Sequence, residues 1–192
     1  MRYIALEEAF FIPELAELQP VSDALRFMKS LGFEPEYAER YQRRLTDFTE
    51  YRLPEMDDAG IDVQVLSLTV PGLQIDIDAG KARDTARIAN DHLAKVIDEH
   101  PDRFRGFAAL PLQDPAAAAA ELERSVTQHG LCGALVNDCI YGPGGRYLDA
   151  AEYDELWSAL ESLGVPLYLH PGSPPADHWR VLDGHPELYG AP

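Results

Sequence analysis

The sequence predicts an α/β protein of the (β/α)8 TIM-barrel type, with this chain supplying about the first five β-α units. Short apolar runs alternate regularly with longer stretches at helical spacing. The runs are apolar on both faces, which is typical of parallel strands covered by helices. No glycine-rich phosphate-binding turn follows the first run, which argues against a dinucleotide-binding sheet. A closed barrel needs about 250 residues, whereas this chain has 192.

Five strands and four long helices are expected along the chain. The strands are expected over residues 3–6, 61–68, 104–110, 133–136 and 165–170. The helices are expected over residues 49–59, 81–99, from 115 onward, and 151–163. Gly60 suits the C-terminal stop of the first helix. Asp114 can cap the third helix, and Pro115 suits its first turn.

We expect one barrel domain over residues 1–192, incomplete at its C-terminal end. Within it, residues 10–48 are rich in aromatic side chains and are expected to form an insertion with one or two helices. Such a segment could cover a flat substrate, and it could equally serve in packing or subunit contact.

Composition and charge exclude several classes of protein. The chain is 46% hydrophobic and 26% charged, as in an ordinary globular domain rather than a disordered chain. Its net charge of −17 disfavours nucleic acid as a partner. No apolar run is long enough to span a membrane, and the carboxylates of Glu7 and Glu8 interrupt any signal peptide. Two isolated cysteines, Cys132 and Cys139, favour reduced thiols in a cytoplasmic protein.

Polar side chains follow the expected strands at the end where barrel enzymes place their active sites. Glu7 ends the first strand, Thr69 follows the second, Asn137 ends the fourth and His170 ends the fifth. A carboxylate and an imidazole from different strands suit zinc or manganese. Since side chains alternate along a strand, only one of Glu7 and Glu8 can face the barrel mouth. The alternative is a solvated Glu7 and a hydrogen-bonded His170 without metal.

Six segments of the chain together form a specific pattern. They are residues 4–10 (IALEEAF), 66–74 (LSLTVPGLQ), 87–91 (RIAND), 101–104 (PDRF), 109–115 (ALPLQDP) and 167–171 (LYLHP). These segments resemble one family, the metal-dependent aromatic-acid decarboxylases of the amidohydrolase superfamily. Its members include the γ-resorcylate, 2,3-dihydroxybenzoate and 5-carboxyvanillate decarboxylases.

The resemblance implies a (β/α)8 barrel that binds one divalent metal ion, with Glu7 and His170 as two of its ligands. Many members carry a histidine two residues after that glutamate, where this chain has Ala9. Fewer histidine ligands favour manganese over zinc. The family's remaining metal ligand and its proton donor, an aspartate, would lie beyond Pro192. The catalytic acid is therefore not assigned.

The implied reaction is the non-oxidative decarboxylation of a phenolic or related aromatic carboxylic acid. Thr69 and Asn137 are expected to line the substrate pocket. Two alternatives stay open: a non-catalytic truncated barrel that serves in binding or assembly, and a related metal-dependent hydrolase, hydratase or cyclase. Because a half-barrel exposes strand edges, we also expect a homo-oligomer or a second chain that completes the barrel.

Overall fold

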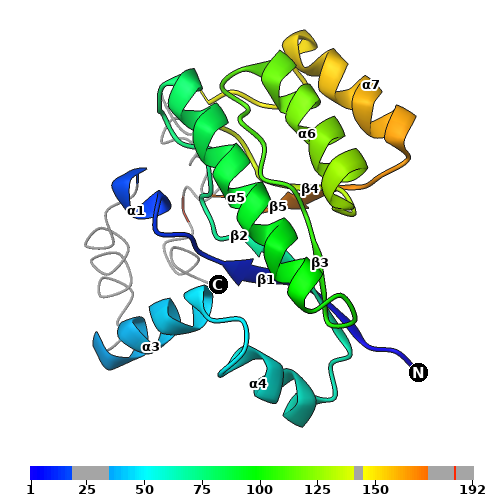
Figure 1. Ribbon diagram of the computed structural model, residues 1–192. Coiled ribbons are helices and arrows are strands. Elements are labelled where there is room, and N and C mark those ends of the chain that lie inside the picture. Colours follow the sequence, from blue (N-terminus) through cyan, green and yellow to red (C-terminus); the bar gives the residue numbers. More distant parts are fainter. Residues whose placement is uncertain (19–34, 141–144, 173–183, 185–192) are drawn as a thin grey trace.

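The structure is a computed structural model that describes residues 1–18, 35–140, 145–172 and Gly184. Strands and helices alternate along the chain (Figure 1). In order they are β1 (Ile4–Phe10), α1 (Leu15–Leu18), α3 (Pro35–Thr46), α4 (Arg52–Ala59), β2 (Val63–Leu68), α5 (Ala79–Glu99), β3 (Phe104–Gly106), α6 (Pro115–His129), β4 (Ala134–Asn137), a 3₁₀ turn (Ala151–Tyr153), α7 (Asp154–Leu163) and β5 (Leu167–His170).

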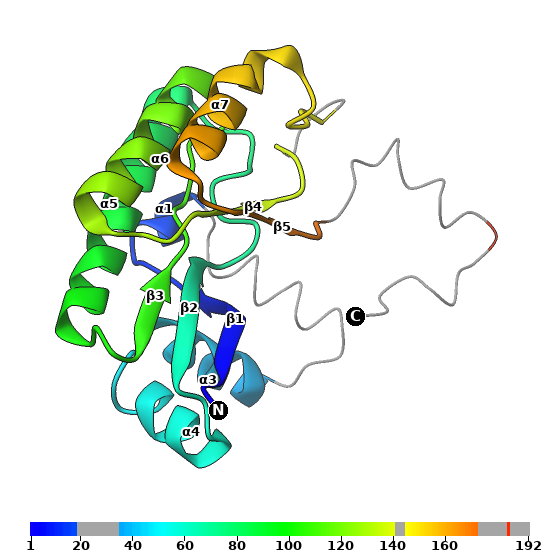
Figure 2. The same ribbon diagram turned by 90° about the vertical axis from the view of Figure 1, so that its right-hand side faces the viewer.

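The named strands pair in parallel, as the sequence predicts. β1, β2 and β3 form one sheet in that order, and β4 pairs with β5 in a second. A parallel bridge between Ala108 and Ala134 joins the two pieces just after β3. In Figure 2, α5, α6 and α7 stand together on one side of these strands. This layering is that of consecutive β-α units.

The side chains of the strands divide between two apolar clusters. The larger cluster fills the space between the strands and the helices and includes Leu66, Leu93 and Leu122. The smaller one consists of Val65, Phe107 and Leu135, with Cys132 and Tyr168 packed against them. Since Val65 and Leu66 are neighbours on one strand, the two clusters lie on opposite faces. We call the face that carries the smaller cluster the inner face.

Three expectations about strands need correction. β1 runs on to Phe10 instead of ending at residue 6, because its pairing with β2 resumes at Glu8. β3 is shorter than expected, since the chain after Gly106 turns to bridge β4. The strands were expected to be buried on both faces, and this holds for β2 and β4. β1 and β5 instead lie at the two sheet edges, where Ile4 is 57% and Leu169 63% exposed.

Helix ends follow the expected signals. Asp114 caps α6 by accepting a hydrogen bond from the Ala117 backbone N–H at 3.1 Å, and Pro115 occupies the first turn. α4 ends at Gly60, as expected, and starts three residues later than expected. No described helix is long and apolar enough to cross a membrane. Cys132 and Cys139 are free thiols, as expected.

The aromatic-rich residues 10–48 contain the end of β1, α1 and α3 in their described part, and residues 19–34 lie outside it. The ring of Phe10 is buried in the larger cluster, 6.2 Å from the ring of Phe48. Phe48 in turn lies 6.4 Å from Phe104 of β3. Phe10 and Phe48 therefore pack with the larger cluster, between the strands and the helices, and not on the inner face. Whether the segment is an insertion in its own right stays a prediction.

Candidate metal centre

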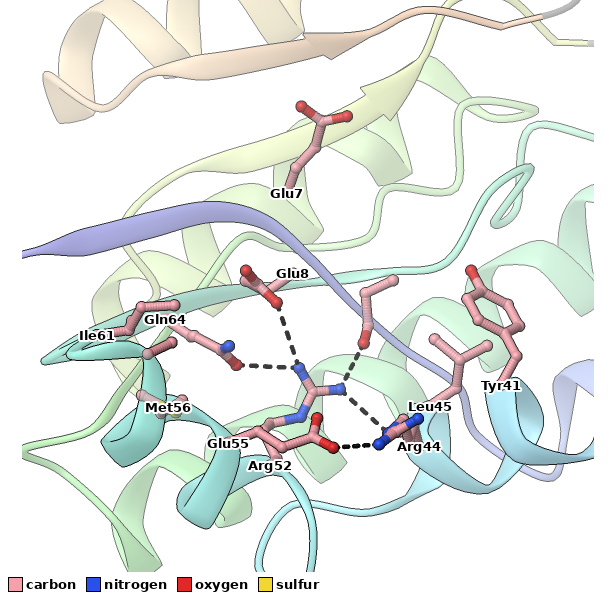
Figure 3. A pocket seen from close by; sticks show the side chains of 12 residues that line it. Glu7, Glu8, Tyr41, Arg44, Leu45, Arg52, Glu55, Met56, Ile61 and Gln64 are labelled. Carbon is pink, nitrogen blue, oxygen red and sulfur yellow. Dashed lines mark hydrogen bonds and ion pairs between the residues drawn. The ribbon is translucent and has the colours of Figure 1, made fainter. Parts of the chain in front are cut away.

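A β-bulge in the middle of β1 sets the direction of Glu7, which lies within the strand and not at its end as expected. Ala5 is opposite Gln64 of β2 and Glu8 is opposite Leu66, so three steps on β1 match two on β2. Glu7 has a φ of 66°, a left-handed backbone conformation that residues other than glycine rarely adopt. Bulges of this kind redirect side chains near functional sites. Figure 3 shows Glu7 and Glu8 leaving β1 on opposite sides, so only Glu7 faces the inner side.

The structure brings Glu7 and His170 together. Nε2 of His170, the last residue of β5, lies 3.0 Å from Oε1 of Glu7. The hydroxyl of Tyr168, also on β5, donates a hydrogen bond to Oε2 of Glu7 at 2.5 Å. Both oxygens of one carboxylate thus meet side chains from the same strand. β1 and β5 are not neighbours in the sheets, so the contact crosses the inner face.

Tyr168 is a site residue that was not singled out from the sequence. Its position two residues before His170 places both side chains on one face of β5, and this spacing was the available signal. The hydrogen bond with Glu7, assisted by desolvation and the carboxylate's charge, raises the pKa of the Tyr168 phenol. The hydroxyl therefore stays protonated at neutral pH and acts as a donor to the carboxylate.

The Glu7–His170 pair fits a divalent cation. Two atoms bound about 2.1 Å from one ion in adjacent positions lie about 3 Å apart, which is the distance found here. Nδ1 of His170 is buried and has no hydrogen-bond partner among the described residues. In the described part of the chain, no three His, Cys, Asp or Glu side chains gather to form a larger metal cluster. His178 and His185 lie outside that part.

Asn137 lies beside His170 in the β4–β5 register. It is only 2% exposed, and its Nδ2 donates to Oε1 of Gln74 at 3.1 Å. The backbone N–H of Asn137 donates to the same oxygen at 3.3 Å. Gln74 therefore orients the Asn137 amide, a role for which the sequence offered no separate signal.

Thr69 lies at the end of β2, and its backbone N–H donates to the Phe10 carbonyl at 2.9 Å. It is half-buried. In the described part of the chain, neither the Thr69 nor the Asn137 side chain is hydrogen-bonded to Glu7 or His170. Their role in substrate binding stays a prediction.

A second non-glycine residue with positive φ, Asp138 at 60°, directly follows β4. Strained backbone of this kind is commonest at functional sites, because the surrounding structure must hold it in place. In the described residues, Glu7, in the middle of β1, and Asp138, directly after β4, are the two such positions. Asp138 lies at the carboxyl end of its strand, the end at which barrel enzymes place their chemistry.

Comparison with known proteins identifies the family. Residues 25–188 match the amidohydrolase family. The chain belongs to this family. It is 45% identical to the γ-resorcylate decarboxylase of Rhodococcus jostii, over 97% of this chain and 56% of that protein.

Two solved structures of decarboxylases resemble this amidohydrolase chain. The dihydroxybenzoic acid decarboxylase of Polaromonas sp. JS666, with bound manganese and the inhibitor 2-nitroresorcinol, has a TM-score of 0.82 and 40% identity, over 98% of this chain and 55% of that one. The 5-carboxyvanillate decarboxylase of Novosphingobium aromaticivorans, also with bound manganese, has a TM-score of 0.83 and 34% identity, over 94% and 54%. The chain spans about half the length of these relatives and forms part of a TIM barrel.

Proposed function

We propose that this chain carries part of the active site of a metal-dependent, non-oxidative aromatic-acid decarboxylase. Glu7 and His170 serve in this proposal as two ligands of one divalent cation. The observation that carries it is the 3.0 Å approach of their side chains on the inner face. Manganese is the preferred ion, since both similar solved structures contain it. Zinc would suit the same pair of ligands.

The chain's own residues position and charge the site. Glu7 supplies a negative charge and an oxygen ligand, and His170 supplies a neutral nitrogen ligand. Tyr168 holds Oε2 of Glu7, which leaves Oε1 turned toward His170. When bound, the cation would neutralise and orient the carboxylate and neighbouring hydroxyl of a phenolic acid. Thr69 and Asn137 are our proposed pocket residues, with the Asn137 amide held by Gln74.

The exposed sheet edges support a further part of the proposal, that another polypeptide segment completes the barrel. Leu6 on β1 is 50% exposed, and Ile4 and Leu169 are similarly exposed. Apolar side chains on unpaired strands are costly in water. The completing segment would be further sequence of the same protein or a second chain. We also propose a cytoplasmic location, supported by the free cysteines.

The test is chelation and metal restoration in the protein expressed from its whole reading frame. We expect CO2 release from 2,6-dihydroxybenzoate or another phenolic acid to stop after EDTA treatment and to return with Mn²⁺. A full rate in the metal-free protein would refute the metal mechanism. Metal binding without CO2 release from any phenolic acid tested would favour a related hydrolase, hydratase or cyclase. Loss of both would favour the non-catalytic alternative.

A further inference from the structure

The guanidinium of Arg52 is buried on the outer side of β1, opposite Glu7 (Figure 3). The Arg52 side chain, from the first residue of α4, is only 10% exposed. It borders a cavity of about 470 Å³ between β1, β2, α3 and α4. Charged groups in such places are costly unless hydrogen bonds and opposite charges satisfy them.

The hydrogen bonds of Arg52 join four elements. Nη2 donates to the carbonyl of Ala9 on β1 at 2.7 Å and to that of Arg44 on α3 at 3.3 Å. Nη1 donates to Oε1 of Gln64 on β2 at 3.0 Å. Nε donates to the Asp47 carbonyl, just after α3, at 3.2 Å. The planar fork of an arginine can reach several acceptors at once in this way.

Arg52 also faces Glu8, the residue directly after Glu7. Nη1 lies 3.8 Å from Oε2 of Glu8, which is a loose ion pair. Burial raises the pKa of Glu8, and the charge of Arg52 opposes that shift. Burial likewise lowers the pKa of Arg52, and Glu8 and Asp47 oppose it. The two charges therefore support each other in a place where neither is well solvated.

The bulge is the part of β1 that needs such support. At Glu7 the backbone has a positive φ, a conformation that is strained for a residue with a side chain. The regular register with β2 is also interrupted between Ala5 and Glu8. Arg52 contacts the next two residues, Glu8 through its side chain and Ala9 through its carbonyl. It thus holds the strand immediately after the strained residue.

We propose that Arg52 is a positioning residue that holds the β1 bulge and so keeps the Glu7 carboxylate turned toward His170. This inference rests on the proposed function, in which Glu7 binds the cation. Arg52 itself lies on the outer side of β1 and has no place among the metal ligands. Its effect is transmitted through the backbone of Glu8 and Ala9.

The test compares Mn²⁺ affinity and stability in Arg52→Met, Arg52→Lys and a matched control, Arg103→Met. Arg103 also donates hydrogen bonds to backbone carbonyls just after α4, those of Ile61 and Asp62. It forms an ion pair with Asp57 at 2.7 Å. It has no hydrogen bond or ion pair with β1 among the described residues. Binding is followed by electron paramagnetic resonance of free Mn²⁺, and unfolding by urea. Neither readout requires activity.

We expect Arg52→Met to weaken Mn²⁺ binding about 10- to 100-fold, the range seen when residues that orient metal ligands are removed. Arg52→Lys keeps the buried cation but cannot span the same acceptors, so we expect about 5-fold weaker binding. Arg103→Met should lose stability while its Mn²⁺ affinity stays within about 2-fold of wild type.

The outcomes separate this inference from the proposed function. If wild-type protein and Glu7→Gln bind Mn²⁺ equally, the proposed metal site itself is wrong. If binding depends on Glu7 but either folded Arg52 variant retains wild-type affinity, the positioning role is overturned. Weakening in Arg103→Met equal to that in Arg52→Met would also overturn it, because the effect would then follow from general loss of stability.

Discussion

Glu7→Gln is expected to weaken Mn²⁺ binding more than about 100-fold and to abolish decarboxylation. Glutamine has the same shape but lacks the negative charge, and its amide nitrogen cannot bind a cation. Loss of a direct ligand should exceed the 10- to 100-fold effect of losing an orienting residue. Isothermal titration with Mn²⁺ and a CO2-release assay, on the protein from its whole reading frame, measure the two effects.

Glu123→Gln is the matched control, because it makes the same change at an exposed position on α6. It should bind Mn²⁺ and release CO2 like the wild type. His170→Ala should resemble Glu7→Gln, since the two side chains lie on one site. Retention of Mn²⁺ affinity in Glu7→Gln within a few-fold of wild type would show that the carboxylate is not a ligand.

Gly133→Ala is expected to lower the free energy of unfolding by about 3 kcal/mol or more. Gly133 precedes β4 with a φ of 150°, and a Cβ there would lie 2.3 Å from the carbonyl oxygen of Pro166. Backbone must move to relieve that clash. Its movement would break the hydrogen bond from the Ala134 N–H to the Pro166 carbonyl, 3.2 Å long, where β4 meets β5. Urea unfolding measures the loss.

Gly130→Ala serves as the control for Gly133→Ala. Gly130 also has a positive φ, 67°, but nothing lies within 4 Å of the Cβ position. Its cost should therefore be only that of the backbone conformation, about 1 kcal/mol. Equal losses in the two variants would mean that β4 and β5 are not packed as closely as described. Because β4 and β5 carry Asn137 and His170, Gly133→Ala should also weaken Mn²⁺ binding.

Local patterns in the sequence predict much of this fold. The alternation of apolar runs and helical stretches identifies the five strands and their parallel pairing, because each pattern reflects burial on the faces of one element. Asp114 locates the start of α6 through its side-chain carboxylate, and Gly60 locates the end of α4 through its left-handed backbone. The prediction that Glu7 and His170 meet is confirmed, but only His170 lies at the carboxyl end of its strand, and Glu7 reaches it from the bulge in the middle of β1.

Other features depend on contacts between distant segments, and the sequence alone does not show them. The bulge at Glu7 places a glutamate at positive φ, against its intrinsic preference, and Arg52 contacts it from more than forty residues away. The hydrogen bond from the Asn137 amide to Gln74 likewise joins the end of a strand to a distant loop. The exposure of β1 and β5 follows from their place at the sheet edges rather than from their composition.

The most direct test of the metal site is anomalous X-ray scattering at the manganese absorption edge, from crystals of the protein grown with Mn²⁺. We expect one strong peak on the inner face, about 2.2 Å from both Oε1 of Glu7 and Nε2 of His170. A well-ordered Glu7–His170 pair with no anomalous peak between them, or a manganese ion bound elsewhere, would contradict it.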